Sequence, residues 1–367
     1  MVVWESYGQD GWHLGVFGQR FGDGAQPIGS EFQVNSMTVG RQFRVAVAAE
    51  PSGEFVVAWE SYYANDTDVF ARRFDSEGNP EGEEFQVNSR TSGGHCCVDV
   101  HRDGQGGFVA LWENTLYPSP SEILFRRFDS SGVPMGEEVS VAGGHPLIGS
   151  PRASMLGIEG LAVVWEDRPG TDWDVLARRL DPTGQPLGEA FVVSSQATYN
   201  QSSPSVGADS EGNFVVVWNS TIGGTEQGFG RRFSSTGSAL GDEFAINSFY
   251  PWSEWEIDPV VAVDGSGSFL VTWLPWGVDE ILGQRFRPTG APAGNRFQIN
   301  EYTPGHQMHS AVAANGAGDF VIVWDSYGQD GSRHGVWGRR LRMPYFADGF
   351  ESADVCEWSA TLGGDCV

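Results

Sequence analysis

The chain has 367 residues, and its 48 acidic residues outnumber the 22 basic ones, which gives a formal charge of −26 at pH 7. All of the basic residues are arginine, because the sequence contains no lysine. Such an acidic chain is repelled by nucleic-acid phosphates and by anionic lipid surfaces, so we exclude nucleic acid as a partner. No run of about 18 apolar residues occurs, so no membrane insertion is expected.

A tryptophan returns about every 53 residues, and this repeat organises the chain. A chain of this length exceeds the size at which a single hydrophobic core usually stops growing. A repeat array avoids that limit, because each unit packs only against its neighbours. The tryptophan stands at seven positions, which are Trp4, Trp59, Trp112, Trp165, Trp218, Trp273 and Trp324.

The most complete copy of the repeat, residues 44–89, contains four short apolar segments. Each has the length of a strand and is rich in β-branched and aromatic residues. A glycine before the second segment, Gly53, and a Gly-Pro-Gly pattern before the fourth indicate tight turns. We name the segments strands a to d, and they are ValAlaValAla (45–48), PheValValAlaTrp (55–59), ValPheAlaArgArgPhe (69–74) and GluPheGlnValAsn (84–88).

Four strands of this length cannot bury both faces of their own sheet, whereas sheets packed around an axis cover one another. We therefore predict an all-β, seven-bladed β-propeller of four-stranded antiparallel blades over residues 1–342, followed by a C-terminal tail, residues 343–367. The first copy lacks strand a and the last copy lacks strand d, so the first and last blades are expected to be incomplete. The segment that begins at Met343 is a candidate for the missing d strand.

An arginine ends strand c in every copy, and an acid follows the tryptophan in five copies. Because strands b and c are neighbours, we expect the two to form an ion pair within each blade. Where the acid is replaced, by Asn219 or Leu274, the arginine is expected to bond a backbone carbonyl instead. The arginines are Arg20, Arg73, Arg127, Arg179, Arg232, Arg285 and Arg340, and the acids are Glu5, Glu60, Glu113, Glu166 and Asp325.

The segments TrpGluSerTyrGlyGlnAspGly at 4–11 and TrpAspSerTyrGlyGlnAspGly at 324–331, with the GluPheGlnValAsn strand, resemble repeats of large secreted or surface-attached bacterial proteins. The resemblance extends from Val2 to Leu341. It implies an extracellular propeller-like array, often beside adhesin or calcium-dependent modules, and it carries over no catalytic residue. The chain opens inside a repeat and without a signal sequence, so we expect upstream sequence to be missing, with a short native start as the alternative.

The four cysteines form two pairs with different expectations. Cys356 and Cys366 lie ten residues apart in a glycine-rich tail, a spacing that suits a local disulfide in an oxidising compartment. Cys96 and Cys97 are adjacent, and they lack the paired spacing and the histidine partners of a zinc site. We expect that adjacent pair to be buried thiols.

The loops between strands b and c and between d and a share one face of a propeller, and these loops differ between copies. Varied loops on a constant scaffold favour recognition. Exposed aromatic side chains near Asn, Asp and Gln suit stacking on sugar rings or anchoring a protein. The alternative is that they close the loops over the propeller rim. The loop tryptophans are Trp12, Trp173, Trp252, Trp255 and Trp276, of which Trp252 and Trp255 are the strongest candidates.

A second candidate set lies seventeen residues before each repeat tryptophan. Five of its six members are polar, so we expect them at the mouth of the central channel, as a site for a small ligand or a cation. The alternative is that they cap strands and hold channel water. The residues are Gln42, His95, Ile148, Gln201, Glu256 and Gln307.

Calcium is the one cofactor that the sequence brings forward. Aspartates in the loops between strands b and c offer hard oxygen ligands. They lack the dense alternation of a dedicated calcium loop, and solvated acidic loops explain them as well. These weak metal candidates are Asp10, Asp66, Asp68, Asp172, Asp174 and Asp330.

These features favour an extracellular, non-catalytic binding or adhesion propeller that recognises a glycan or a surface protein through its varied loops. One alternative is a glycan-cleaving hydrolase, which needs two carboxyl groups about 5–9.5 Å apart at the central channel. Another is a structural spacer module of a longer surface protein. The seven histidines are scattered and no nucleophile elbow occurs, so no catalytic residue is assigned.

Overall fold

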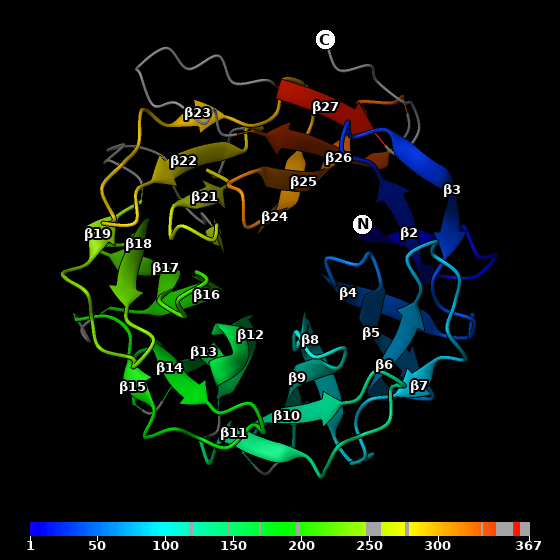
Figure 1. The fold of residues 1–367 in the computed structure, drawn as a ribbon, viewed down its shortest axis with the longest axis horizontal. Coiled ribbons are helices and arrows are strands. Elements are labelled where there is room, and N and C mark those ends of the chain that lie inside the picture. The colour runs from blue at the N-terminus through cyan, green and yellow to red at the C-terminus, as the bar shows by residue number, and fades with distance from the viewer. Residues whose placement is uncertain are drawn as a thin grey trace. The chain divides into compact units, whose positions relative to one another are not determined.

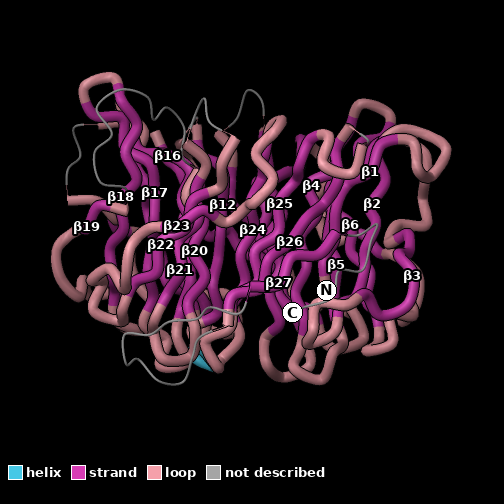
Figure 2. The backbone as a smooth tube through the Cα atoms, turned by 90° about the horizontal axis from the view of Figure 1, so that it is seen from above, coloured by secondary structure: helices cyan, strands magenta, loops and turns pink. Residues whose placement is uncertain are grey.

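The computed structural model describes residues 1–116, 120–145, 147–168, 170–195, 199–246, 258–275, 279–331, 333–342 and 355–359. Strands make up nearly all of the regular structure in these residues, as Figure 2 shows, beside one 3-10 turn at Gly157–Glu159. None of the described helices is long and apolar enough to cross a membrane. Two compact units divide the chain, unit 1 at Met1–Arg20 and Ile28–Val192, and unit 2 at Phe21–Pro27 and Val193–Val367.

Unit 1 carries four antiparallel sheets, each with its strands in chain order (Figure 1). The first sheet has three strands and lacks strand a, as predicted. The strands are β1 (Val2–Tyr7), β2 (Leu14–Phe21) and β3 (Pro27–Gln33); β4 (Arg41–Ala49), β5 (Phe55–Tyr63), β6 (Asp66–Phe74) and β7 (Phe85–Gln86); β8 (Gly94–Arg102), β9 (Phe108–Thr115), β10 (Glu122–Phe128) and β11 (Val139–Gly143); β12 (Ile148–Met155), β13 (Leu161–Asp167), β14 (Asp174–Leu180) and β15 (Phe191–Val192).

Unit 2 carries three further sheets of four antiparallel strands. They are β16 (Gln201–Ala208), β17 (Phe214–Ile222), β18 (Thr225–Phe233) and β19 (Phe244–Ala245); β20 (Val260–Val263), β21 (Phe269–Trp273), β22 (Leu282–Phe286) and β23 (Phe297–Gln298); β24 (Gln307–Ala314), β25 (Phe320–Tyr327), β26 (His334–Leu341) and β27 (Val355–Ser359).

The protein is a seven-bladed β-propeller of antiparallel sheets, which confirms the predicted fold. The seventh repeat itself supplies three strands, and the tail adds β27, which pairs with β26. The candidate segment at Met343 lies outside the described residues, as does Cys366, so the expected tail disulfide stays a prediction.

Strand b is the most buried strand of the second to sixth sheets, in β5, β9, β13, β17 and β21, because neighbouring strands and sheets cover both of its faces. Trp112 of β9 is fully buried and packs with Val56 and Ala58 of β5, in the preceding sheet. Trp165 lies in an equivalent cluster with Leu111 of β9. The tryptophan is buried in the second to seventh repeats, where it acts as a packing residue, whereas Trp4 of the first repeat is half-buried.

The ion pair expected between the acid after the tryptophan and the arginine of strand c was wrong. In the antiparallel pairing Glu60 lies opposite Val69, whereas Arg73 lies opposite Val56 at the other end of the strands. This register places the two charges too far apart along the hairpin. Arg73 pairs instead with Glu81, at 3.0 Å.

Four of these arginines bond a backbone carbonyl in a turn of the following repeat, and Arg340 of the seventh repeat bonds one in the first repeat. Arg232, whose copy has Asn219 in place of the acid, bonds such a carbonyl, which confirms the expectation for that copy. A guanidinium presents five donors in a rigid planar fork, whereas an ammonium group has three donors on a flexible stem, and this favours arginine over lysine where several fixed acceptors are bonded at once. The bonds run from Arg20 to Glu77, Arg73 to Ser130, Arg127 to Pro182, Arg232 to Pro288 and Arg340 to Asp23.

Candidate functional site

Two hairpins of unit 1 expose aromatic side chains at their tips. Tyr7 is 74% exposed and Trp12 is 60% exposed between β1 and β2, and Tyr62 and Tyr63 are 39% and 59% exposed at the end of β5. The exposed position of Trp12 agrees with the sequence analysis. Tyr7 lies beside the imidazole of His13, with 6.1 Å between ring centroids.

Local sequence explains the shape of both tips. Gly8 and Gly11 adopt φ values of 76° and 91°, which favour glycine, and the Asp10 carboxylate accepts the backbone N–H of Trp12 at 3.0 Å. Between β5 and β6, Ala64 and Asn65 both adopt left-handed φ, as a two-residue hairpin turn requires. The turns thus place the aromatic side chains at the ends of rigid hairpins.

Of the other four loop tryptophans that were predicted to bind a ligand, the structure describes only Trp173. Trp173 precedes β14 and is half-buried. Trp252, Trp255 and Trp276 lie outside the described residues, so their part in a site stays a prediction.

The residues seventeen positions before each repeat tryptophan lie at the start of the first strand of their sheets and are buried where the structure describes them. Gln307 accepts the indole N–H of Trp324 at 3.0 Å. The other described polar members also have partners within their surroundings, which favours the strand-capping alternative over an open ligand site. Glu256 lies outside the described residues. The remaining contacts are Gln42 with Asn35 and the Val39 carbonyl, His95 with the Thr67 carbonyl, and Gln201 with Ser194, and Ile148 is buried.

A β-bulge interrupts the first strand of most sheets, and sequence reasoning missed it. At each bulge a non-glycine residue adopts left-handed φ, between 49° and 62°. At two of these bulges, the acid after the tryptophan of the preceding sheet accepts the backbone N–H of the left-handed residue, so the acid links consecutive sheets. The left-handed residues at these bulges are Arg44, Cys97, Ser150, Ser203 and His309, and the acid links run from Glu5 to Arg44 and from Glu60 to Cys97.

Two of these acids have raised pKa values because the sheets bury them. Burial raises the pKa of Glu60 to about 7, although the Cys97 N–H and the Arg44 guanidinium act in the opposite direction. Burial also raises the pKa of Glu113 above its ordinary value. In the sequence, the signal that could have pointed to these acids is their constant position directly after the repeat tryptophan.

The candidate calcium aspartates hold local structure. Asp10 accepts the backbone N–H of Trp12, and Asp66 accepts that of Thr67 at 2.9 Å. Asp68 accepts a hydrogen bond from the side-chain amide of Asn88 at 2.7 Å. Asp174 has a raised pKa because of its burial and of Asp172 beside it. Among the described residues, no aspartate of this set belongs to a group of three ligand atoms close enough for one ion. Calcium binding, including at Asp330, stays a prediction.

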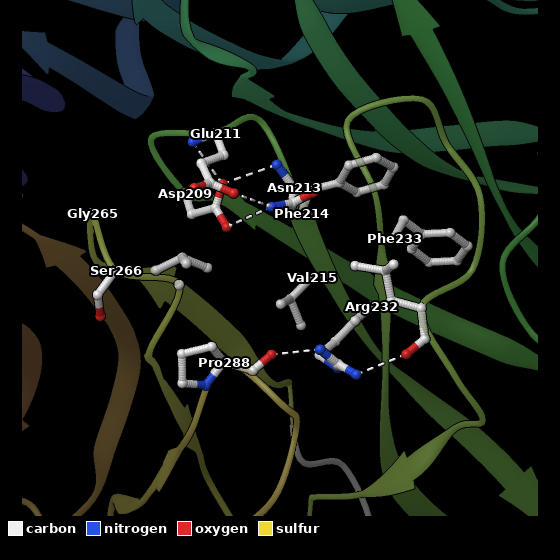
Figure 3. Close-up of a pocket in the computed structure, with 13 residues that line it drawn as sticks. Asp209, Glu211, Asn213, Phe214, Val215, Arg232, Phe233, Gly265, Ser266 and Pro288 are labelled. Atoms are coloured by element: carbon white, nitrogen blue, oxygen red, sulfur yellow. Dashed lines mark hydrogen bonds between the residues drawn. The ribbon is translucent and has the colours of Figure 1, made fainter.

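A cavity of about 260 Å³ in unit 2 is lined by turn residues of the repeat (Figure 3). The Asp209 carboxylate accepts the backbone N–H groups of Glu211 and Asn213, and Arg232 bonds the carbonyl of Pro288. The same aspartate turn recurs between the first two strands of other sheets, at Asp103 and Asp264. The cavity is thus a feature of the scaffold, since the varied loops do not line it.

The seventh repeat provides a test by pH, because Asp325 accepts bonds from His309 and His334 at 3.5 and 3.1 Å. Burial raises the pKa of Asp325, but the two imidazoles outweigh it and the net pKa is lowered. A lowered carboxyl pKa adds stability above the ordinary value of about 3.9, which is lost as the pH falls through the folded-state pKa. In melting experiments near neutral pH, Asp325→Asn should have a lower melting temperature than the wild type. This difference in melting temperature should shrink below about pH 4. A difference in melting temperature that stays constant with pH contradicts this role of the two histidines.

Comparisons with known proteins are informative about the fold alone. No family model and no curated protein matches the chain. The chain is similar to the α-L-arabinanase of Penicillium chrysogenum complexed with arabinobiose, at 14% identity and a TM-score of 0.54, over 82% of this chain and 94% of that one. It is also similar to a putative 6-phosphogluconolactonase of Bacteroides fragilis, at 15% identity and a TM-score of 0.56, over 99% and 94%.

A third similar structure is the β-propeller domain of the trilobed protease of Pyrococcus furiosus. It matches at 9% identity and a TM-score of 0.54, over 100% of this chain and 92% of that one. These matches agree with the propeller seen in the sheet topology. Their names differ widely, and a shared fold does not transfer a function.

Proposed function

We propose that the protein is an extracellular, non-catalytic binding or adhesion propeller that recognises a glycan through the exposed hairpins of unit 1. The observation that carries this proposal is the group of four exposed aromatic side chains, Tyr7, Trp12, Tyr62 and Tyr63. Large aromatic side chains in water are unfavourable unless a partner covers them, and their faces suit the apolar faces of sugar rings.

The two hairpins belong to consecutive sheets. Strand β1 contacts β4, and the two hairpins join equivalent strands of the repeat. Their tips therefore point to the same side of the blades, which gives a glycan more than one stacking surface. His13 and Asn65 lie at these tips and offer hydrogen-bonding groups beside the aromatic faces.

A glycan fits this surface better than a nucleic acid or an anionic lipid, because the chain carries a formal charge of −26. A propeller of similar fold, the arabinanase of P. chrysogenum, is known in complex with arabinobiose, so the proposed ligand class is compatible with this fold. The extracellular location rests on the resemblance of the repeat to secreted and surface-attached bacterial proteins.

A glycan array with the full chain tests the proposal, and each hit is measured with and without calcium. Replacing Trp12 and Tyr63 together by alanine should weaken binding to a hit by at least about tenfold, because each removes a stacking surface. Calcium dependence would add support for the aspartate candidates of the loops.

The matched control is Ile158→Ala, which removes an exposed apolar side chain from the 3-10 turn between β12 and β13. This variant should bind as the wild type does. A glycan hit that the double variant retains unchanged places the site elsewhere. An array without any hit overturns the glycan class and leaves a protein partner to be sought.

A further inference from the structure

The adjacent cysteines lie at the bulge of β8, in unit 1, where Cys96 still pairs with Glu113 and Cys97 is the first bulged residue. Between the pairs Cys96–Glu113 and Asp99–Leu111, two residues of β8 face a single residue of β9. Successive side chains of a regular strand point to opposite faces, but a bulge breaks this alternation. Cys97 adopts a φ of 62°, and the Sγ atoms of Cys96 and Cys97 therefore lie only 3.2 Å apart.

Glu113 of β9 adds a third group to the two thiols. Its Oε2 atom lies 3.6 Å from the Sγ of Cys96, and the three ligand atoms are all within 4.8 Å of one another. All three residues are half-buried, and both cysteines are free thiols. The spacing of the cysteines alone argued against zinc, but the third group comes from the neighbouring strand, which spacing within β8 does not reveal.

The scaffold does not need this cysteine pair. The equivalent bulges of the other described sheets have no thiol at these two positions, although the fold there is the same. The cysteines are therefore a property of this one blade, whereas the acid after the tryptophan recurs. The equivalent pairs are Phe43 and Arg44, Gly149 and Ser150, Ser202 and Ser203, and Met308 and His309.

We propose that Cys96, Cys97 and Glu113 bind a thiophilic divalent cation, Zn²⁺, through two thiolates and one carboxylate, with the fourth position open. In a tetrahedral zinc site a thiolate sulfur and a carboxylate oxygen lie about 3.6 Å apart, which equals the separation of Cys96 and Glu113. Two thiolates on one zinc ion lie about 3.8 Å apart, so the two sulfur atoms must separate by about 0.6 Å. Small rotations of the two side chains supply that movement.

The charged groups around Cys96 and Cys97 favour a cation that stabilises two thiolates. The Glu60 carboxylate accepts the Cys97 N–H and fixes the bulge, while Arg44 lies 3.7 Å from the Cys97 sulfur. When a metal ion displaces the thiol protons, two thiolates and the Glu113 carboxylate lie beside one guanidinium, and the divalent cation offsets this negative charge. A hard cation such as Mg²⁺ or Ca²⁺ prefers oxygen ligands throughout, and two sulfur ligands exclude it.

Thiol alkylation of the reduced full chain, followed by tryptic peptide mapping, tests the site. Cleavage after Arg90 and Arg102 places both thiols in one peptide, separate from Cys356 and Cys366. Added Zn²⁺ should slow alkylation of this peptide by at least about tenfold, and Mg²⁺ or Ca²⁺ should not. In a competition titration with a zinc indicator, the wild type should bind one equivalent more than Cys96→Ser/Cys97→Ser.

Glu113→Gln should weaken this binding by at least about tenfold, since it removes a ligand. The matched control is Glu122→Gln, a carboxylate of the same sheet that pairs with Arg90, and it should bind as the wild type does. Equal alkylation with and without Zn²⁺ overturns the proposal. So does a chain in which Cys96 and Cys97 form a disulfide with each other that a mild reductant does not open.

Discussion

Replacing Trp112 by alanine is expected to lower the free energy of unfolding by about 3–5 kcal/mol, the range for removing a buried large aromatic side chain. The side chain is fully buried, in one hydrophobic cluster with Val56 and Ala58 of the preceding sheet and Leu124 of its own. Its removal opens a cavity that neither sheet can fill without moving its strands. Chemical denaturation followed by circular dichroism measures the loss.

The matched control is Trp12→Ala, because Trp12 is the same residue type but lies exposed on a hairpin. It should change the free energy of unfolding by no more than about 0.5 kcal/mol, as surface substitutions usually do. The control also separates a loss of glycan binding from a loss of folding. A cost below about 1 kcal/mol for Trp112→Ala contradicts its role as a packing residue between sheets.

The second large effect is expected for Gly184→Ala, with a loss of about 2–5 kcal/mol from backbone strain and overpacking together. Gly184 adopts a φ of 88°, and a Cβ atom there would lie 2.2 Å from a ring carbon of Phe125. This turn packs against the preceding sheet, so neither the ring nor the backbone can give way easily. The melting temperature and the denaturation midpoint both report the loss.

Gly136→Ala is the matched control for the close approach at Gly184. No heavy atom lies within 4 Å of a Cβ at Gly136, and its φ is not in the left-handed region. The control should stay within about 0.5 kcal/mol of the wild type. If the contact with Phe125 causes the loss, Gly184→Ala should cost less in a Phe125→Ala background, and equal costs in both backgrounds rule that cause out.

Much of the fold follows from local signals in the sequence. The seven repeat tryptophans, the apolar segments beside them and the glycine turns predicted the strands and the number of blades. The exposed position of Trp12 also follows, because its loop differs from the constant strand. Such features depend on residues near one another in the chain, where spacing and turn chemistry are decisive.

The partners of the charged residues did not follow from the sequence. Arg73 was expected to meet Glu60 because both belong to neighbouring strands, but the antiparallel register puts them at opposite ends. The carbonyl that Arg73 bonds belongs to Ser130, in the next repeat. Sequence spacing within one repeat contains no information about which atoms of the following blade lie within reach.

The sequence by itself determined that this chain forms seven repeats of short antiparallel strands and that the recurring tryptophan is a packing residue, as it is in the second to seventh repeats. Only the tertiary structure decided that the first strands carry bulges, and that one bulge turns Cys96 and Cys97 toward Glu113. The physical reason is that strand content depends on local alternation and turn residues. The meeting of side chains depends instead on register, on a single inserted residue and on packing against the next blade.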